Sequence, residues 1–323
     1  MTRIVAIDIG GTHARFAFAE VAGGRVLSLG DACTLRTAEH PSLESAWAAF
    51  GAAAGGELPN AAAIAAAGPV EAELLRVTNH PWVVRPASIP ETLGVEQYTI
   101  VNDFGAVAHA VAQLGDEHFR HLCGPDRPLP KTGAISVLGP GTGLGVAQLL
   151  RGAGGYQVIE TEGGHVDFAP LDEVEDGILA QLRLRHGRVS VERILSGPGL
   201  ANLYEALAVV GGREPSLPDQ KSLWQSALAG DDGLAASALD RFCLSLGSVA
   251  GDIALAQGAQ GVAIGGGLGL RLAGHLPGSG FRRRFIAKGR FERRMDEMPV
   301  KIITYAQPGL FGAAAAFAAE HVE

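Results

Sequence analysis

The chain has 323 residues, of which 47% are hydrophobic and 19% charged, and its formal net charge is −8. This composition describes a globular chain with ample core material and excludes a disordered one. A length above about 250–300 residues predicts two domains rather than one core. The negative charge offers no basic surface to nucleic acid or anionic membranes, so neither is an expected partner.

Three scattered cysteines, Cys33, Cys123 and Cys243, lack the paired spacing of a metal site. They predict reduced thiols in a cytoplasmic protein rather than a disulfide framework or a zinc knuckle. The first apolar run is cut by Asp8, too early for a secretory signal. The longest apolar stretch is interrupted at Asp252 and beyond, so no membrane span is predicted.

The first predicted element is a β-branched run over residues 4–9 that carries Asp8 near its end. Such a run is typical of a strand buried on both faces. Gly10, Gly11 and Thr12 follow, and the alternating residues after them predict a strand that returns beside the first. The glycines leave N–H groups uncovered for an anion, and the carboxylate of Asp8 needs a cation or hydrogen-bond donors. We interpret this turn as a phosphate site, with an ordinary glycine hairpin as the alternative.

The next elements alternate between strands and helices, which is typical of an α/β domain. They are a strand at 25–29, a helix at 43–54, and strands at 61–67 and 99–101. Asn102 and Asp103 follow the last of these strands, and 106–114 has a helical pattern. Both side chains are therefore expected at the carboxyl end of a strand, where ligand groups gather in α/β sheets. The alternatives are a helix N-cap for Asp103 and a turn residue for Asn102.

A second glycine turn repeats the pattern of the first. An apolar run at 135–138 leads into a glycine-rich turn at 139–145, and a strand resumes at 146–150. Two such units in one chain resemble the actin-like ATPase and sugar kinase superfamily, in which two turns hold the phosphates of a nucleotide between two domains.

The residues after this turn predict a mainly helical segment that ends in a strand and a helix. Helices are expected at 171–185, 200–210, 222–229 and 234–256, strands at 262–264 and 300–305, and a final helix at 308–319. The strand at 262–264 leads into Gly265, Gly266 and Gly267 at the start of a helix. These glycines would let an adenine or ribose lie against the backbone, although close packing also uses glycine.

Glu162 and His165 flank a Gly-Gly bend that a ligand can approach closely. A carboxylate and an imidazole suit a sugar, because each sugar hydroxyl donates and accepts hydrogen bonds. A metal site with Asp167 as third ligand and a core histidine are the alternatives. Glu192 is expected in the first turn of a helix capped by Ser190, where the helix dipole alone favours a carboxylate.

Seven segments together resemble the bacterial glucokinase family, in its branch without the cysteine-rich zinc motif. They are residues 8–15, 78–82, 101–105, 138–145, 162–170, 189–200 and 308–310, in the order of the family. The stretch 162–170 together with Ser196-Gly197-Pro198-Gly199 is the most specific. The chain departs from the family at His13, where asparagine is common, and only histidine gains charge near neutral pH.

The resemblance implies an α/β protein with the two-domain actin-like ATPase (ribonuclease H-like) sugar kinase fold and an interdomain cleft. It implies a small α/β domain at 1–104, a large α/β domain at 105–304, and a C-terminal helix at 305–323 that returns to the small domain. The implied reaction is ATP-dependent phosphorylation of glucose to glucose 6-phosphate. A homodimer is implied as well.

The same resemblance assigns roles to the residues above. Asp103 would be the general base that accepts the proton of the sugar hydroxyl. The sugar would be bound by Asn102, Asp103, Glu162, His165 and Glu192. The nucleotide, ATP, would be bound by Asp8, Gly10, Gly11, Thr12, Gly141, Thr142, Gly143, Gly265, Gly266 and Gly267. Asp8 would orient Mg²⁺ through water, because this ion keeps much of its hydration.

Other classes of protein fit the residues less well. The chain has no Gly-Lys-Ser/Thr sequence, which excludes the P-loop NTPases. A sugar-sensing regulator on the same fold, without turnover, is an alternative; such proteins usually carry a DNA-reading domain first, whereas the first strand here begins at Ile4. A kinase of another hexose is a second alternative, and the donor can be ATP or polyphosphate.

Overall fold

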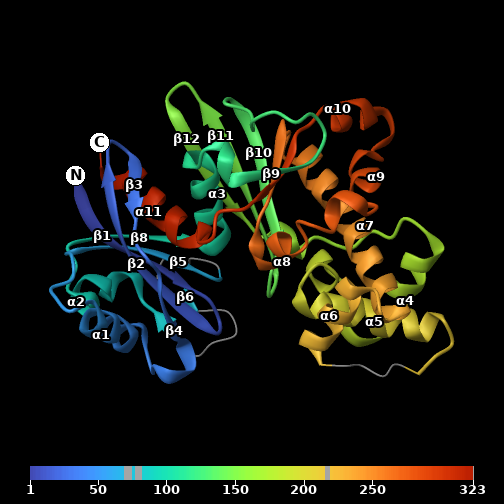
Figure 1. The fold of residues 1–323 in the computed structure, drawn as a ribbon, viewed down its shortest axis with the longest axis horizontal. Coiled ribbons are helices and arrows are strands. Elements are labelled where there is room, and N and C mark those ends of the chain that lie inside the picture. The colour runs from blue at the N-terminus through green and yellow to red at the C-terminus, as the bar shows by residue number, and fades with distance from the viewer. Residues whose placement is uncertain (69–74, 77–81, 215–218, 323) are drawn as a thin grey trace. The chain divides into compact units, whose positions relative to one another are not determined.

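The computed structural model describes residues 1–68, 75–76, 82–214 and 219–322, and its elements are mixed α/β. Its internal contacts divide the chain into two compact units (Figure 1). The first contains Met1–Gly115, Val158–Glu160 and Tyr305–Glu323, and the second contains Asp116–Gln157 and Thr161–Thr304. The domain limits expected from the sequence, at 104 and 304, stay a prediction.

The sheet of the first unit has the order β3-β2-β1-β5-β8, with β4 also paired to β2. Its strands are β1 (Thr2–Ile9), β2 (His13–Ala22), β3 (Arg25–Leu29), β4 (Cys33–Arg36), β5 (Ala61–Ala66) and β8 (Gln97–Asn102). β1 and β2 run antiparallel, which confirms the predicted turn between them. β5 and β8 lie parallel to β1, so these three strands end at one edge of the sheet. That edge carries the first glycine turn and the Asn102–Asp103 pair.

Helices cover both faces of this sheet (Figure 1). On one face, α1 (Leu43–Ala54) follows Ser42, whose hydroxyl caps it by accepting a hydrogen bond from the Ser45 amide. Phe50 of this helix stacks on Phe16 of β2 with ring centroids 5.2 Å apart. The unit also contains the short helix α2 (Ile89–Leu93) and the two-stranded pair of β6 (Leu75–Arg76) and β7 (Val83–Val84).

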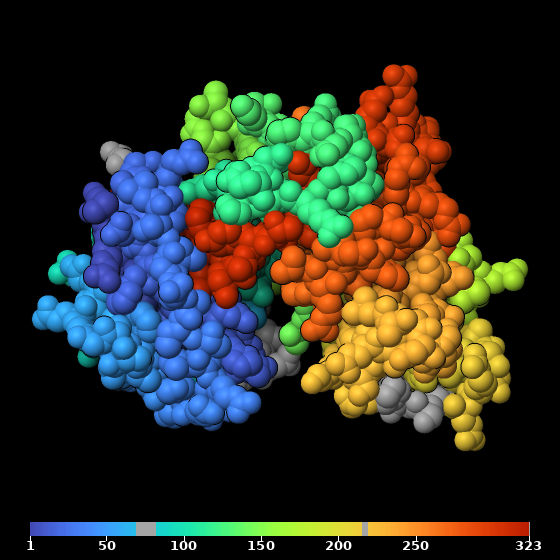
Figure 2. Space-filling view, in the orientation of Figure 1, coloured from blue at the N-terminus to red at the C-terminus, as the bar shows by residue number. Residues whose placement is uncertain are grey.

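α3 (Asp103–Gln113) and α11 (Pro308–His321) cover the opposite face. They cross so closely that a Cβ at Gly312 would overlap the carbonyl oxygen of Ala106. The C-terminal segment lies against the N-terminal strands of the same unit (Figure 2), where the Gly24 amide donates to the Val322 carbonyl at 2.6 Å. The N-terminal turn of α3 is therefore fixed by both the sheet and α11.

The second sheet, which belongs to the second unit except for Val158–Glu160 of β12, has the order β12-β11-β10-β13-β14-β9. Its strands are β9 (Phe119–Cys123), β10 (Gly133–Pro140), β11 (Leu144–Gly152), β12 (Gly155–Thr161), β13 (Gly261–Ile264) and β14 (Val300–Ile303). β10 and β11 are antiparallel, with the second glycine turn between them, as predicted. β13 runs parallel to β10, so its carboxyl end lies beside that turn.

Seven helices of the second unit appear among the described residues: α4 (Glu173–His186), α5 (Gly197–Val210), α6 (Gln220–Ala229), α7 (Gly233–Ala256), α8 (Gly266–Arg271), α9 (Phe281–Ile286) and α10 (Glu292–Asp296). α4 to α7 match the predicted helices within a few residues, and α8 begins at the predicted glycine turn, whereas α9 and α10 were not predicted. An ion-pair cluster ties three of them: Asp172, at the N-cap of α4, accepts from Arg241 at 2.6 Å and from Arg284 at 2.7 Å. None of the helices in the described parts of the chain is both long and apolar enough to cross a membrane.

Candidate active site

The first glycine turn is closed by its own backbone. The Gly10 amide donates to the His13 carbonyl at 3.0 Å, and the buried side chain of Thr37 donates to the Gly11 carbonyl at 3.2 Å. Across the described residues, the amides of Gly11 and Thr12 make no hydrogen bond. The turn thus presents two amides and the exposed side chain of Thr12, which suits an anion.

Asp8 lies beside this turn and is mostly buried. Its Oδ2 is 3.1 Å from the Nη1 atom of Arg15, directly across the β1–β2 pair. Burial raises the pKa of the Asp8 carboxyl, and Arg15 opposes part of that rise. Gly309, in the first turn of α11, has no room for a side chain, because a Cβ there would lie 2.9 Å from Cγ of Asp8. Arg15, which the sequence analysis left out, therefore fixes this carboxylate together with Gly309.

The second glycine turn repeats this arrangement. The Gly141 amide donates to the Gly143 carbonyl at 2.8 Å, and the amides of Thr142 and Gly143 are left without a partner among the described residues. Glu192 supports the turn by accepting a hydrogen bond from the Leu144 amide at 2.9 Å. Its Oε2 fills the space where a Cβ at Gly143 would be. Glu192 was expected near sugar, and this contact with the turn was not foreseen.

One local prediction about Glu192 is wrong. Residues Val191–Arg193 form a single 3₁₀ turn, and the side chain of Ser190 makes no capping hydrogen bond. The helix begins later, at Gly197, because Ser196 caps it by accepting from the Gly199 amide at 3.2 Å. Pro198 lies in its first turn, where proline is favoured.

The glycines at the start of α8 are of two kinds: some are required by close packing, and one lies beside open space. A Cβ at Gly139 would overlap the Gly265 carbonyl oxygen, and Gly266, with φ 77°, would place a Cβ 2.5 Å from the Pro140 carbonyl oxygen. Close packing of β10 on α8 therefore requires glycine there. At Gly267 a Cβ would meet no atom within 4 Å among the described residues, and this residue lines a cavity.

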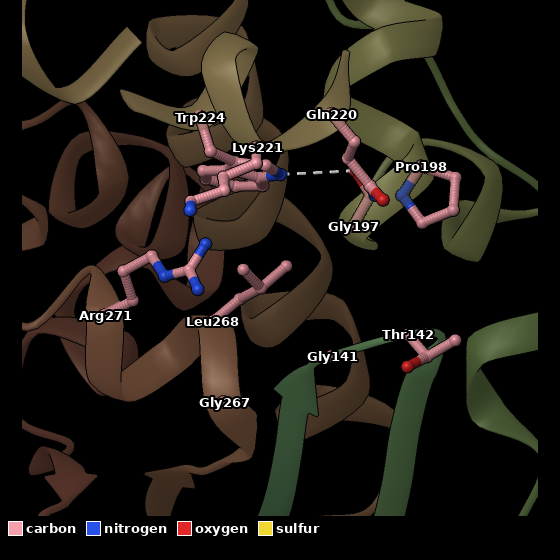
Figure 3. Close-up of a pocket in the computed structure, with 10 residues that line it drawn as sticks. All are labelled: Gly141, Thr142, Gly197, Pro198, Gln220, Lys221, Trp224, Gly267, Leu268 and Arg271. Carbon is pink, nitrogen blue, oxygen red and sulfur yellow. Dashed lines mark hydrogen bonds between the residues drawn. The ribbon is translucent and has the colours of Figure 1, made fainter. Parts of the chain in front are cut away.

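That cavity, of about 460 Å³, opens beside the second glycine turn. It is lined by Gly141, Thr142, Gly197, Pro198, Gln220, Lys221, Trp224, Gly267, Leu268 and Arg271. Figure 3 shows Thr142 across the cavity from Lys221 and Arg271, and the Trp224 indole donates to the Gly197 carbonyl at 3.3 Å. Among the described residues, this lining has two cations and no carboxylate, so it favours a negatively charged ligand.

The Asn102–Asp103 pair opens α3. Asn102 is the N-cap: its Oδ1 accepts from the Phe104 amide at 2.8 Å and from the Gly105 amide at 3.3 Å. Its Nδ2 donates to the Gly68 carbonyl at 3.2 Å. Asp103 is the first helical residue, and its Oδ1 accepts from the Phe104 amide at 2.9 Å. The cap expected as an alternative for Asp103 is thus supplied by Asn102, and Asp103 is half-buried at the edge of the sheet.

Glu162 and His165 lie on an exposed bend, with 3.9 Å between Oε2 and Nε2. A Cβ at Gly164 would overlap the Leu144 carbonyl oxygen, so the bend packs tightly on β11. Asp167 instead pairs with Arg188 at 2.6 Å. Within the described ranges there is no cluster of three His, Cys, Asp or Glu residues arranged for a metal.

Comparison with known proteins gives the family. A family model described as Glucokinase matches residues 5–320. A glucokinase of Zymomonas mobilis subsp. mobilis is 64% identical, over 99% of this chain and 99% of that protein. The chain belongs to the glucokinase family. The family predicted from the sequence is therefore confirmed.

Solved structures of glucokinases share this fold. A glucokinase from an Antarctic psychrotroph superposes with a TM-score of 0.85 and 33% identity, covering 98% of this chain and 99% of that one. A ROK family glucokinase from Streptomyces griseus, solved with glucose and AMPPNP, has a TM-score of 0.63 and 20% identity over 97% and 98% of the two chains. These neighbours confirm the predicted actin-like ATPase fold.

Within this glucokinase-family chain, the sequence analysis missed the far wall of the cavity. Lys221 and Trp224 are three residues apart on α6, and Arg271 ends α8. Their convergence depends on how two helices pack, which leaves no local pattern. The family segment 78–82 falls largely outside the described residues; Trp82 is described, and its indole donates to the His40 carbonyl at 2.9 Å.

Proposed function

We propose that the protein is a glucokinase that transfers the γ-phosphoryl group of ATP to the 6-hydroxyl of glucose, with Asp103 as the general base. The observation that carries this proposal is the matched pair of glycine turns. Each turn closes on its first glycine amide and leaves the next two amides and a threonine hydroxyl for an anion. A phosphate chain offers the oxygens that such donors bind.

The nucleotide side is supported by the cavity beside the second turn. The phosphates would lie at Thr142 and Gly143, and the base and ribose would extend toward Gly267 and Trp224. Lys221 and Arg271 would complement the negative charge of the nucleotide. The first turn, Gly10 to Thr12, would contact the same phosphate chain.

Mg²⁺ fits the carboxylate of Asp8. This ion is commonly held by one or two carboxylates, waters and substrate phosphates, and Asp8 lies beside two unpaired amides of a phosphate turn. When bound, Mg²⁺ would neutralise charge that develops on the transferred group. The residues Arg15 and Gly309 would keep the carboxylate in place for this purpose.

The sugar would be bound by Asn102, Glu162, His165 and Glu192. Glu192 uses Oε2 for the Leu144 amide, which leaves Oε1 for a sugar hydroxyl. Asn102 supplies the N-cap of α3, and Asp103 would accept the proton of the attacking 6-hydroxyl. Closure of the predicted domains, 1–104 with 305–323 and 105–304, would exclude the water that competes for the phosphoryl group. A cytoplasmic homodimer completes the proposal, on the family resemblance.

A coupled assay over a panel of hexoses and phosphoryl donors tests the proposal. We expect ADP and glucose 6-phosphate from ATP and glucose. A sugar-sensing regulator would bind glucose and form no ADP. If another hexose is turned over faster than glucose, that hexose would take the place of glucose in the proposal. If polyphosphate is the faster donor, it would take the place of ATP, and phosphoryl transfer would still be the reaction.

A further inference from the structure

A carboxylate with no role in the chemistry above lies on the N-terminal turn of α3. Glu160, in β12, accepts a hydrogen bond from the Asn102 amide, with 2.7 Å between that nitrogen and Oε1. The same oxygen fills the space where a Cβ at Gly105 would be. Glu160 therefore contacts the residue before Asp103 and the second residue after it.

These contacts act on the peptide that leads into Asp103. Asn102 is the last residue of β8, and its side chain is committed to the Phe104 and Gly105 amides and to the Gly68 carbonyl. Glu160 accepts a hydrogen bond from the main-chain amide of Asn102, so hydrogen bonds restrain both the backbone and the side chain of Asn102. Hydrogen bonds to ionised acceptors are the stronger kind, and anions are favoured at a helix N-terminus.

We propose that Glu160 is a positioning residue for the base Asp103, and that Gly105 is glycine to admit it; this rests on the glucokinase activity proposed above. The carboxylate fixes the main chain at Asn102, which sets the direction in which Asp103 leaves the helix. A misplacement on the order of 1 Å can cost about 10²-fold in rate. Glu162, a proposed sugar ligand, follows two residues later in the chain, so sugar binding there restrains the strand end that carries Glu160.

The role is separable from helix stability. Glu160 is exposed, so its removal leaves no cavity. Alanine is a better helix former than glycine, so Gly105→Ala by itself favours α3. A lower kcat in Gly105→Ala would therefore report displacement of the carboxylate rather than a weakened helix.

A double-mutant cycle on the full chain tests this proposal. Glu160→Ala and Gly105→Ala are each expected to lower kcat by about tenfold, with KM for glucose and ATP changed by less than about threefold. The double variant should resemble either single variant, because both remove one contact. Glu160→Gln should recover most of kcat, since its amide oxygen can accept the same bond. Thermal unfolding should stay near wild type, and the exposed Glu96→Ala, near the start of β8, is the matched control.

The outcomes separate this proposal from the function on which it rests. No turnover of any sugar by the wild-type protein would overturn both. Normal wild-type turnover with unchanged kcat in Glu160→Ala would overturn the role of Glu160 alone. Additive losses in the double variant would overturn it too, and Glu160→Ala, which introduces no overlap, keeps the test decisive if Gly105→Ala unfolds.

Discussion

Gly143→Ala probes the proposed link, through Glu192, between the second glycine turn and the sugar. A Cβ at this position would overlap Oε2 of Glu192, which accepts a hydrogen bond from the Leu144 amide at 2.9 Å. The added methyl group fits only if the carboxylate leaves that amide. A hydrogen bond to a charged group contributes about 1.5–3 kcal/mol, and the half-buried position of Glu192 favours the lower figure. Because about 1.4 kcal/mol is a factor of ten, we expect KM for glucose to rise about tenfold.

The matched control is Gly141→Ala in the same turn, where a Cβ meets no atom within 4 Å among the described residues. Both variants border the proposed phosphate site, so KM for ATP is expected to change in each. Only Gly143→Ala should change KM for glucose, measured by a coupled assay at saturating ATP. An unchanged KM for glucose in Gly143→Ala, with thermal unfolding near wild type, would refute the idea that this carboxylate links turn and sugar.

Three further predictions concern the base, the metal and the acid stability. Asp103→Asn should lower kcat by about 10² to 10⁴ with folding retained; turnover within a few-fold of wild type would exclude Asp103 as base. Gly309→Ala places a Cβ 2.9 Å from Cγ of Asp8. The variant should therefore need several times the wild-type concentration of Mg²⁺ for half-maximal activity in a Mg²⁺ titration. EDTA should abolish turnover in both proteins. Burial lowers the pKa of His109 from 6.5 to about 4, so the unfolded chain binds the extra proton below pH 6.5 and stability falls as pH falls toward 4. Between pH 7 and pH 5, urea unfolding of wild type should lose on the order of 2 kcal/mol more than His109→Gln, and equal losses would contradict this.

Most strands of both sheets followed from local pattern, although β4, β9 and β12 were not predicted. The run at β1, the alternation at β2 and the Ser42 cap of α1 all act within a few residues, so the sequence contains their whole cause. The turn glycines were also predictable, since glycine pairs after buried strands are a local signal. Ser190 shows the limit of prediction from local pattern. A serine ahead of the Glu192 carboxylate predicted a helix cap, but the serine that caps the helix is Ser196.

Contacts that join distant residues left no such signal. Glu192 lies 48 residues from Leu144, whose amide donates a hydrogen bond to it, and Glu160 lies 58 residues from Asn102. Trp224 and Arg271 come together at the cavity only because α6 and α8 converge there. The sequence could suggest that Glu192 belongs to the site, through family resemblance, but not which backbone group it holds.

Glycine in this chain does more than leave amides open to an anion. Three carboxylates occupy the space that a Cβ would take: Asp8 against Gly309, Glu160 against Gly105 and Glu192 against Gly143. In each case a side chain at the glycine would displace the acid from its own partner: Arg15, the Asn102 amide or the Leu144 amide. A carboxylate that orients a metal, a base or a sugar, as proposed for these three, has to be held in one position. These glycines therefore fix the acids as much as they free the backbone. Alanine at any of the three should therefore disturb the chemistry more than the stability.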